Sequence, residues 1–284
     1  WYGDHRDLHV RSRRQRQMCI RDREGDTLVT DNQKMAEILN KWYTSMFTRE
    51  DLQQMPEAEQ IFSGDTPLTS VKFTSEAVLK KLKKLNPNSA PGPDGIWTRV
   101  IHSMADVICT PLAIIYTKCL EEGEVPPEWK TANVAPIFKK GSKSVPGNYQ
   151  RVSLTCVPCK VMEKIICYAI IEHLKECDLI RRSQYVFMRS GSTLTNLLSY
   201  LEDLTRIMDV GNWLDVVHLD FSKAFDKVPI QRLLNKCSGL RIQGTLLIGV
   251  KNKNRGHFGT TARVFLRQWR ISCRILTIFG MQIE

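Results

Sequence analysis

The feature that most constrains this chain is a short apolar run that ends in a carboxylate, within the segment Leu214 to Val228, LDVVHLDFSKAFDKV. Residues 216–219 have the pattern of a buried strand, and Asp220 follows them directly. A strand that presents an aspartate at its tip commonly holds a divalent metal, because hard cations prefer carboxylate oxygens. The segment therefore predicts a buried strand with a candidate metal ligand at its end.

Three other segments carry motifs: NSAPGPDGI (Asn88–Ile96), ANVAPIFKKGSKSVPGNYQRVSLTCVPCKVMEKII (Ala132–Ile166) and SQYVFMRSGSTLTNLL (Ser183–Leu198). Together with VVHLDFSKAFDKVPIQRLLNK (Val216–Lys236), they resemble the reverse transcriptase of non-LTR (LINE-type) retrotransposons, of the jockey-like kind. Each segment alone is a weak signal, whereas four in the family's order are strong. The likeness extends from residue 23 to residue 240.

The resemblance implies an α+β fold made of the helix-rich fingers and the start of the palm of a right-hand polymerase, with an incomplete antiparallel sheet. It divides the chain into four parts. Residues 1–23 are a basic tail, 24–131 a helical region leading into the fingers, 132–240 the fingers and start of the palm, and 241–284 a diverged basic tail. The first tail contains RSRRQR and is expected to be disordered or foreign sequence. The alternative is a nuclear-localisation or nucleic-acid patch.

Hydrophobic periodicity and capping residues predict a series of helices. The first begins after Asp31 or Asn32 and runs to Phe47, and the second is capped by Thr74 or Ser75 and turns four lysines outward. Further helices are predicted over residues 105–122, 158–176, 193–209 and 230–237, and a short strand over 134–138. Glycines at 123 and 211 are expected to end two of these helices.

Composition narrows the class of protein only in part. The net charge of +11 invites a nucleic-acid partner, but residues 227–284 hold eleven Lys or Arg against one acid, and residues 1–23 hold seven Arg against three Asp. The basic excess therefore lies in the two ends, and a polymerase body needs local lysine and arginine clusters instead. No apolar run has the length of a membrane span, and no secretory leader follows Trp1, so an intracellular location, nuclear or cytoplasmic, is expected.

The resemblance assigns chemistry to the Asp220 segment. Polymerases join a nucleotide to a primer 3′-OH by an in-line displacement that two Mg²⁺ ions stabilise. By resemblance, Asp220 is the catalytic carboxylate and first Mg²⁺ ligand, and the Phe221 carbonyl lies beside the metal. Phe225 stands where the family places the ring that crowds a ribose 2′-OH and so favours deoxynucleotides. The implied partners are an RNA template, a DNA primer and dNTPs.

The fingers of the family grip the nucleotide. Lys139 and Lys140 match the lysines of its PIFKKG string, where a lysine acts as a point charge on phosphate. The family continues NYRPISL, but here the string is NYQRVSL, so Arg151 lies one residue beyond the expected arginine and Gln150 takes its place. A slip of one residue on an extended segment turns the side chain to the opposite face. Gln184 matches a nucleotide- or template-side contact.

Other family segments have no counterpart in these 284 residues. We find neither the GVPQG string nor the YADD-type hairpin that supplies the other metal-binding acids, and Glu284 is the only carboxylate residue after Asp226. Losing most of the metal ligands should reduce the rate by several factors of ten. We therefore expect a truncated and diverged copy that does not polymerise alone. A non-catalytic nucleic-acid-binding fragment and a relic without selected function remain as alternatives.

Two other interpretations of the sequence, a zinc site and an ATPase, are rejected. Cys156, Cys159, His173 and Cys177 have the spacing of a CCHC zinc site, but the intervening residues predict one continuous helix. Fourteen helical residues would separate Cys159 from His173 by about 21 Å, too far to share a metal. The Pro- and Gly-rich turn over residues 86–95 lacks the GK[ST] ending of a phosphate-binding loop, which argues against an ATPase.

Overall fold

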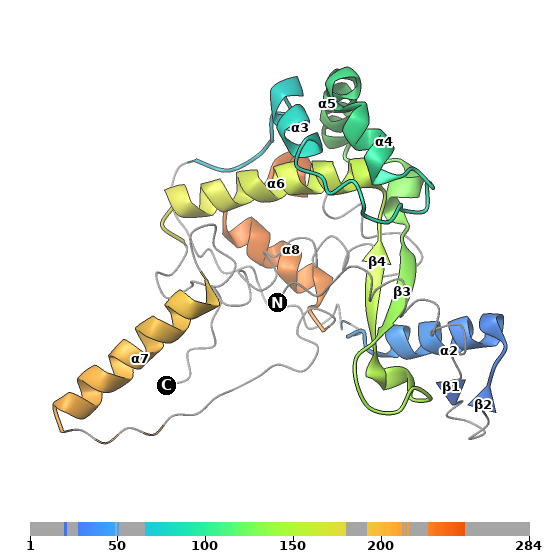
Figure 1. Cartoon of the computed structure of the whole chain (residues 1–284). Coiled ribbons are helices and arrows are strands. Elements are labelled where there is room, and N and C mark those ends of the chain that lie inside the picture. Colours follow the sequence, from blue (N-terminus) through green and yellow to red (C-terminus); the bar gives the residue numbers. More distant parts are fainter. Residues whose placement is uncertain are drawn as a thin grey trace. The chain divides into compact units, whose positions relative to one another are not determined.

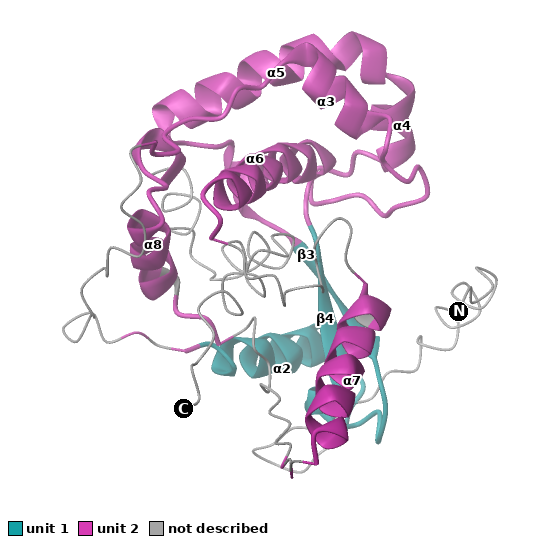
Figure 2. Ribbon diagram, turned by 90° about the vertical axis from the view of Figure 1, so that its left-hand side faces the viewer, with its two compact units in different colours: residues 1–47, 133–154 teal, residues 48–132, 155–284 magenta. Residues whose placement is uncertain are grey.

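The computed structural model describes residues 20–21, 28–48, 50, 66–179, 192–211, 213, 215 and 227–247. The chain divides into two compact units, residues 1–47 with 133–154 and residues 48–132 with 155–284 (Figure 2). Within these described ranges, helices are combined with small antiparallel sheets, which confirms the predicted α+β class. Most of both predicted basic tails, residues 1–19 and 248–284, lies outside the described residues.

The first unit joins one helix to two small sheets. Strands β1 (Ile20–Arg21) and β2 (Leu28–Val29) pair antiparallel, helix α2 follows (Asn32–Ser45), and strands β3 (Asn133–Phe138) and β4 (Tyr149–Leu154) pair antiparallel across the short helix η3 (Pro146–Asn148). As predicted, Asp31 caps α2, because its side chain accepts a hydrogen bond from the Lys34 N–H at 2.9 Å. The hydrophobic core of this unit contains Ile20, Met35, Leu39, Tyr43 and Tyr149.

The second unit is helical (Figure 1). It contains α3 (Ser75–Leu82), α4 (Thr98–Ser103), α5 (Ala105–Glu122), the short helix η2 (Pro127–Lys130), α6 (Val157–Glu176), α7 (Thr193–Asp209) and α8 (Ile230–Gly239). The predicted helices are confirmed, and Gly123 ends α5 in the left-handed conformation with φ of 67°. Helix α4 was not predicted, because six residues are too few to show a period.

The core of the second unit is built against α6. Val78 and Leu82 of α3 are fully buried, and α3 contacts both α5 and α6. Tyr116 of α5 lies between the rings of Phe73 and Trp129, with centroid distances of 5.4 and 5.8 Å. The Tyr116 hydroxyl donates a hydrogen bond to the Pro158 carbonyl of α6 at 2.7 Å, which satisfies a buried polar group.

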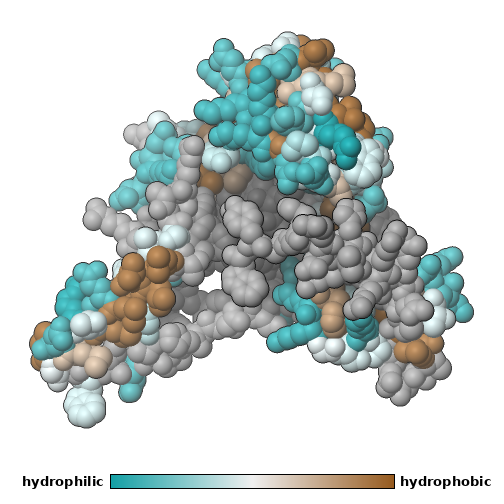
Figure 3. Space-filling model, viewed as in Figure 1, coloured by the Kyte–Doolittle hydropathy of each residue, from teal (hydrophilic) through white to brown (hydrophobic). Residues whose placement is uncertain are grey.

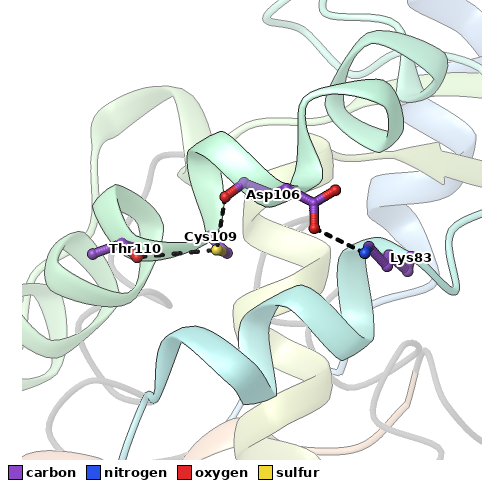
Figure 4. A network of polar contacts seen from close by, with 4 residues as sticks. All are labelled: Lys83, Asp106, Cys109 and Thr110. Carbon is purple, nitrogen blue, oxygen red and sulfur yellow. Dashed lines mark hydrogen bonds and ion pairs between the residues drawn. The ribbon is translucent and has the colours of Figure 1, made fainter.

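A polar network joins the end of α3 to the start of α5 (Figure 4). The Lys83 ammonium lies 2.8 Å from the Asp106 carboxylate, and the Cys109 thiol donates to the Asp106 carbonyl at 3.3 Å. Thr110 lies beside Cys109 and donates to Ser75 at 3.1 Å. Because both charged side chains of the ion pair are exposed, we expect it to contribute little to stability.

Near the end of the described residues, the chain pairs with a much earlier segment of the second unit. Leu68 pairs in parallel with Ile242, through hydrogen bonds to Arg241 and Gln243 of 2.9 and 3.0 Å. Leu240, Ile242 and Leu246 are almost fully buried. The core thus continues past residue 240, where the family resemblance ends. The predicted domain boundaries stay predictions.

In the part of the chain that the structure describes, no helix combines the length and apolar character that crossing a bilayer requires.

Candidate nucleotide-binding hairpin

Three of the predicted site residues lie in one described element, the β3–β4 hairpin. Lys139 and Lys140 directly follow β3, and Arg151 is the third residue of β4. The remaining predicted site residues lie outside the described residues: Gln184, Asp220, Phe221 and Phe225. The described geometry of the candidate site is therefore that of its lysine-bearing hairpin.

The hairpin is regular along its whole length. Six residue pairs run from Asn133↔Leu154 to Phe138↔Tyr149. Beyond the ladder, the Lys139 N–H donates to the Asn148 carbonyl at 2.9 Å, so the pairing extends into the first lysine. The Phe138 and Tyr149 rings meet edge to face at 5.5 Å and close the end of the sheet.

The loop between the strands is held in shape by its own hydrogen bonds. The Asn148 side-chain amide donates to the Ser142 carbonyl at 2.8 Å, and the Tyr149 hydroxyl donates to the Lys143 carbonyl at 2.7 Å. Gly141 has φ of 85°, and a Cβ there would lie 2.6 Å from the Asn148 amide nitrogen. The positive φ therefore favours glycine, while a Cβ would require only the Asn148 side chain to shift, and the loop presents its lysines from an ordered backbone.

The exposed surface of this loop is positively charged. Lys139, Lys140 and Lys143 are exposed, and the Lys143 ammonium lies 5.9 Å from the centroid of the Phe138 ring. The sequence holds no acidic residue between Glu128 and Glu163, so no carboxylate nearby in the sequence offsets these three charges. Sequence reasoning missed Lys143, although its signal was present as a third lysine within five residues.

Arg151 faces the interior of the first unit. It is 4% exposed, and its guanidinium carbon lies 4.6 Å from the centroid of the Phe47 ring, within the range of a cation–π contact. Gln150 is exposed, so the two neighbours point to opposite faces of β4, as the pleat requires. A nucleotide contact by Arg151 stays a prediction, because in this conformation its charge packs on an aromatic ring.

The first motif segment packs against the end of the second. A Cβ on Gly92 would lie 2.4 Å from the Cys156 nitrogen and 2.5 Å from the Thr155 carbonyl carbon, so only glycine fits this close backbone approach. The Thr98 hydroxyl donates to the Ser89 carbonyl at 3.1 Å and braces the same turn. The structure thus brings together the NSAPGPDGI turn and the residues that follow NYQRVSL.

The second half of the fourth motif is anchored by residues far away in the sequence. The Glu50 carboxylate accepts hydrogen bonds from the backbone N–H groups of Gln231 and Arg232, at 3.0 to 3.2 Å. These donors lie in the first turn of α8, which has no side-chain cap of its own. The Thr48 hydroxyl donates to the Lys227 carbonyl at 2.9 Å. Residues 48 and 50 therefore hold the entry to α8, and no sequence pattern indicated this contact.

Comparison with known proteins supports the resemblance drawn from the motifs. No family model matches the chain. A probable RNA-directed DNA polymerase from transposon BS of Drosophila melanogaster is 24% identical over 58% of the chain. The RNA-directed DNA polymerase from mobile element jockey of the same species is 28% identical over 64% of the chain. A probable RNA-directed DNA polymerase from its transposon X-element is 24% identical over 64%. The chain is similar to the reverse transcriptases of non-LTR retrotransposons.

This reverse transcriptase-like chain matches only part of each relative. The aligned residues cover 18% of the transposon BS protein and 20% of the jockey protein. The chain therefore spans about a fifth of the length of the curated relatives it matches. The relatives' names describe whole proteins, so they do not establish the activity, substrates or partners of this chain.

The helix predicted between Cys156 and Cys177 is present in the structure of this reverse transcriptase-like chain. Helix α6 runs unbroken from Val157 to Glu176, which confirms the continuous helix on which the argument against a CCHC zinc site depended. At its end, the His173 Nε2 atom lies 3.1 Å from the Leu240 carbonyl oxygen, and Cys177 lies 3.9 Å from Nδ1. Within the described ranges, no three His, Cys, Asp or Glu residues are grouped so that they could hold a metal ion.

Proposed function

We propose that this chain is the fingers and the start of the palm of a non-LTR retrotransposon reverse transcriptase. Its β3–β4 hairpin would bind phosphate groups of a dNTP or of the template–primer. The observation that carries the proposal is the ordered hairpin loop with three exposed lysines, Lys139, Lys140 and Lys143, in a stretch without acids. The likeness to RNA-directed DNA polymerases supports it.

The physical argument rests on charge and preorganisation. Lysine ammonium groups act as point charges on phosphate, and their binding to a polyanion is driven by the release of counterions. Because the loop backbone is fixed by Asn148 and Tyr149, little backbone conformational entropy is lost when the lysines meet a phosphate. Phosphate contacts of this kind position a nucleic acid without reading its sequence.

The metal chemistry is proposed from the resemblance alone. Asp220 would hold Mg²⁺, which supplies charge stabilisation at the reacting phosphorus, and the Phe221 carbonyl would lie beside it. Phe225 would exclude ribonucleotides, and Gln184 and Arg151 would contact the nucleotide. Because the family's later acids have no counterpart in the 284 residues, we propose that these residues by themselves do not extend a primer.

Binding is tested by the salt dependence of affinity for a labelled poly(rA)/oligo(dT) hybrid. We expect the double variant Lys139→Ala/Lys140→Ala to bind more weakly, with a salt slope reduced by about 1 for each lysine that neutralises a phosphate in the wild-type complex. The matched control is Lys83→Ala/Lys84→Ala, which removes two exposed lysines at the end of α3. Equal weakening by both variants would show that only total charge matters and would contradict a hairpin site.

Catalysis is tested by primer extension on the same hybrid with Mg²⁺, comparing the chain with Asp220→Asn. We expect no extension from either protein. Extension that the substitution abolishes would overturn the proposed inactivity and would establish Asp220 as catalytic. Salt-dependent binding without extension is the expected result, and it equally supports the second candidate function, a nucleic-acid-binding module, because both depend on the lysine hairpin. A chain that fails to unfold cooperatively would favour a relic.

A further inference from the structure

Two cysteines occupy the first turn of α6 at positions that suit a disulfide. Cys156 is the N-cap residue of the helix, and Cys159 follows three residues later. Residues so spaced at a helix start have Cα atoms about 5 Å apart, within the range that a disulfide bridges without backbone movement. The spacing of the CVPC sequence therefore places the two Cα atoms at a distance that a disulfide can span.

The two sulfur atoms also point toward the same neighbour. The Cys156 thiol lies 3.5 Å from the Glu128 carbonyl oxygen, and the Cys159 thiol lies 3.7 Å from the carbonyl oxygen of Trp129. These are successive carbonyls of η2, so both sulfurs lie beside the same short helix. Neither cysteine forms a disulfide in this structure.

We propose that Cys156 and Cys159 form a dithiol pair that closes to an intramolecular disulfide when a small-molecule disulfide such as oxidised glutathione reaches it. One thiolate attacks the oxidant and releases one equivalent of its thiol, leaving a mixed disulfide. The second thiolate attacks that mixed disulfide and releases the second equivalent. The two cysteines lose two electrons and two protons, and the oxidant is reduced to two thiols.

The surroundings make this reaction slow but do not prevent it. Both side chains are buried, and burial raises the pKa of the Cys156 thiol, with the negative charge of Asp94 adding to the rise. The Cys159 thiol also donates to the Glu163 carboxylate at 3.5 Å, and this hydrogen bond ends when the disulfide forms. Oxidation therefore requires a local opening of the first turn of α6 and some thiolate formation.

The test uses the full chain equilibrated in a series of glutathione redox buffers, then quenched, alkylated in denaturant and digested with trypsin. Cleavage after Arg151 and Lys160 releases residues 152–160, which contain both cysteines and no other. We expect oxidation to protect both cysteines of this peptide from alkylation at once. The resulting peptide should be lighter than the unalkylated dithiol peptide by two hydrogens. Cys156→Ser and Cys159→Ser should each abolish that species, whereas Cys109→Ser, a buried control on α5, should leave it unchanged.

A second measurement asks whether the fold assembles the pair. Because the ordered helix start holds the thiols together, we expect the equilibrium constant for closure to be at least about tenfold larger in native buffer than in concentrated urea. An equal or smaller equilibrium constant in native buffer would overturn the proposal. The proposal would also fail if peptide 152–160 stays doubly alkylated in every redox buffer in which Cys109 stays alkylated. A lasting glutathione adduct on one cysteine without closure would overturn it as well.

Discussion

Helices α6 and α7 are similar in length, at 20 and 17 residues, and yet they present opposite surfaces. Helix α6 is buried over most of its circumference, and its residues contact α3, α5 and α8. Helix α7 is well capped by Ser192 and Thr195, but its leucine stripe is exposed and forms the brown surface along α7 in Figure 3. The exposed members of that stripe are Leu194, Leu197, Leu198 and Leu201.

The comparison of α6 and α7 shows that a periodic pattern of apolar residues predicts a helix but does not predict what covers its apolar face. Helix α7 has the clearer separation of apolar and polar faces, and α6 has apolar residues on nearly every side. A helix that is apolar all round must be buried, which the sequence of α6 already required. An apolar stripe needs only one covering surface, and the sequence of α7 does not say what that surface is. Mutations can test the contrast directly.

The largest effect is expected at the buried end of α6. Leu174 is 1% exposed, and Leu174→Ala should lower the free energy of unfolding by about 2–5 kcal/mol, because it removes buried methyl groups and leaves a cavity. Urea unfolding followed by circular dichroism measures this change. A loss below about 1 kcal/mol would show that α6 is not the packed centre of the second unit.

The next effect is expected where α5 meets α6. Tyr116→Phe removes the hydroxyl that donates to the buried Pro158 carbonyl, and losing this buried hydrogen bond should cost about 1–3 kcal/mol. Burial raises the pKa of Tyr116 far above its ordinary value of 10.0. The unfolded chain therefore releases this proton at a lower pH than the folded chain does.

A pH series checks that second effect. The contribution of Tyr116 is fully present below about pH 10 and is lost as the pH rises further, by about 1.4 kcal/mol per pH unit. Tyr116→Phe should remove this part of the alkaline decline in stability. Parallel declines for the two proteins above pH 10 would contradict the buried phenol.

A smaller effect is expected at the distant cap of α8. Glu50→Ala removes the carboxylate that accepts from the first turn of the helix and should cost about 0.5–2 kcal/mol. Glu124→Ala, at an exposed acid near the end of α5, is the control for loss of charge alone. Denaturant midpoints for the three proteins measure the difference, and equal midpoints for both variants would mean that the cap contributes nothing.

The smallest effect completes the comparison between the two helices. Leu198 of α7 is 56% exposed, and Leu198→Ala should change stability by less than about 0.5 kcal/mol, against the much larger loss for Leu174→Ala. The same urea titration serves both variants. A loss above about 1 kcal/mol at Leu198 would show that the stripe is covered in solution and that α6 and α7 differ less than their exposures indicate.

Much of the local structure could be predicted from the sequence. The caps at Asp31 and Thr74, the stop at Gly123 and the strand before Lys139 are each set by residues within one turn or one loop. Capping and amphipathic periodicity act over three or four residues, so they are visible without a fold. Helix α4 was missed because six residues are too few to show a helical period, and the residues of β4 were treated only as an extended segment.

In the candidate site too, some features could be predicted from the sequence and others could not. Its lysines 139 and 140 and the strand before them could be predicted from the motif, and the pleat alone predicted that Arg151 and Gln150 point apart. The contact of Arg151 with Phe47 could not be predicted, because the two residues are distant in the sequence and meet only when α2 packs with the hairpin in the first unit. The roles of Asp220, Gln184, Phe221 and Phe225 stay predictions.

By itself, the sequence determined the helices, their ends, the basic hairpin and the likeness to non-LTR reverse transcriptases, because motifs and periods are short-range properties of a chain. Only the tertiary structure decided which distant groups meet. Gly92 fits against the backbone of Cys156, Glu50 caps α8 across 181 residues of sequence, and Leu68 pairs with Ile242. Such contacts depend on closing long loops and on excluding water from one particular packing among many, and no local pattern of residues records that choice.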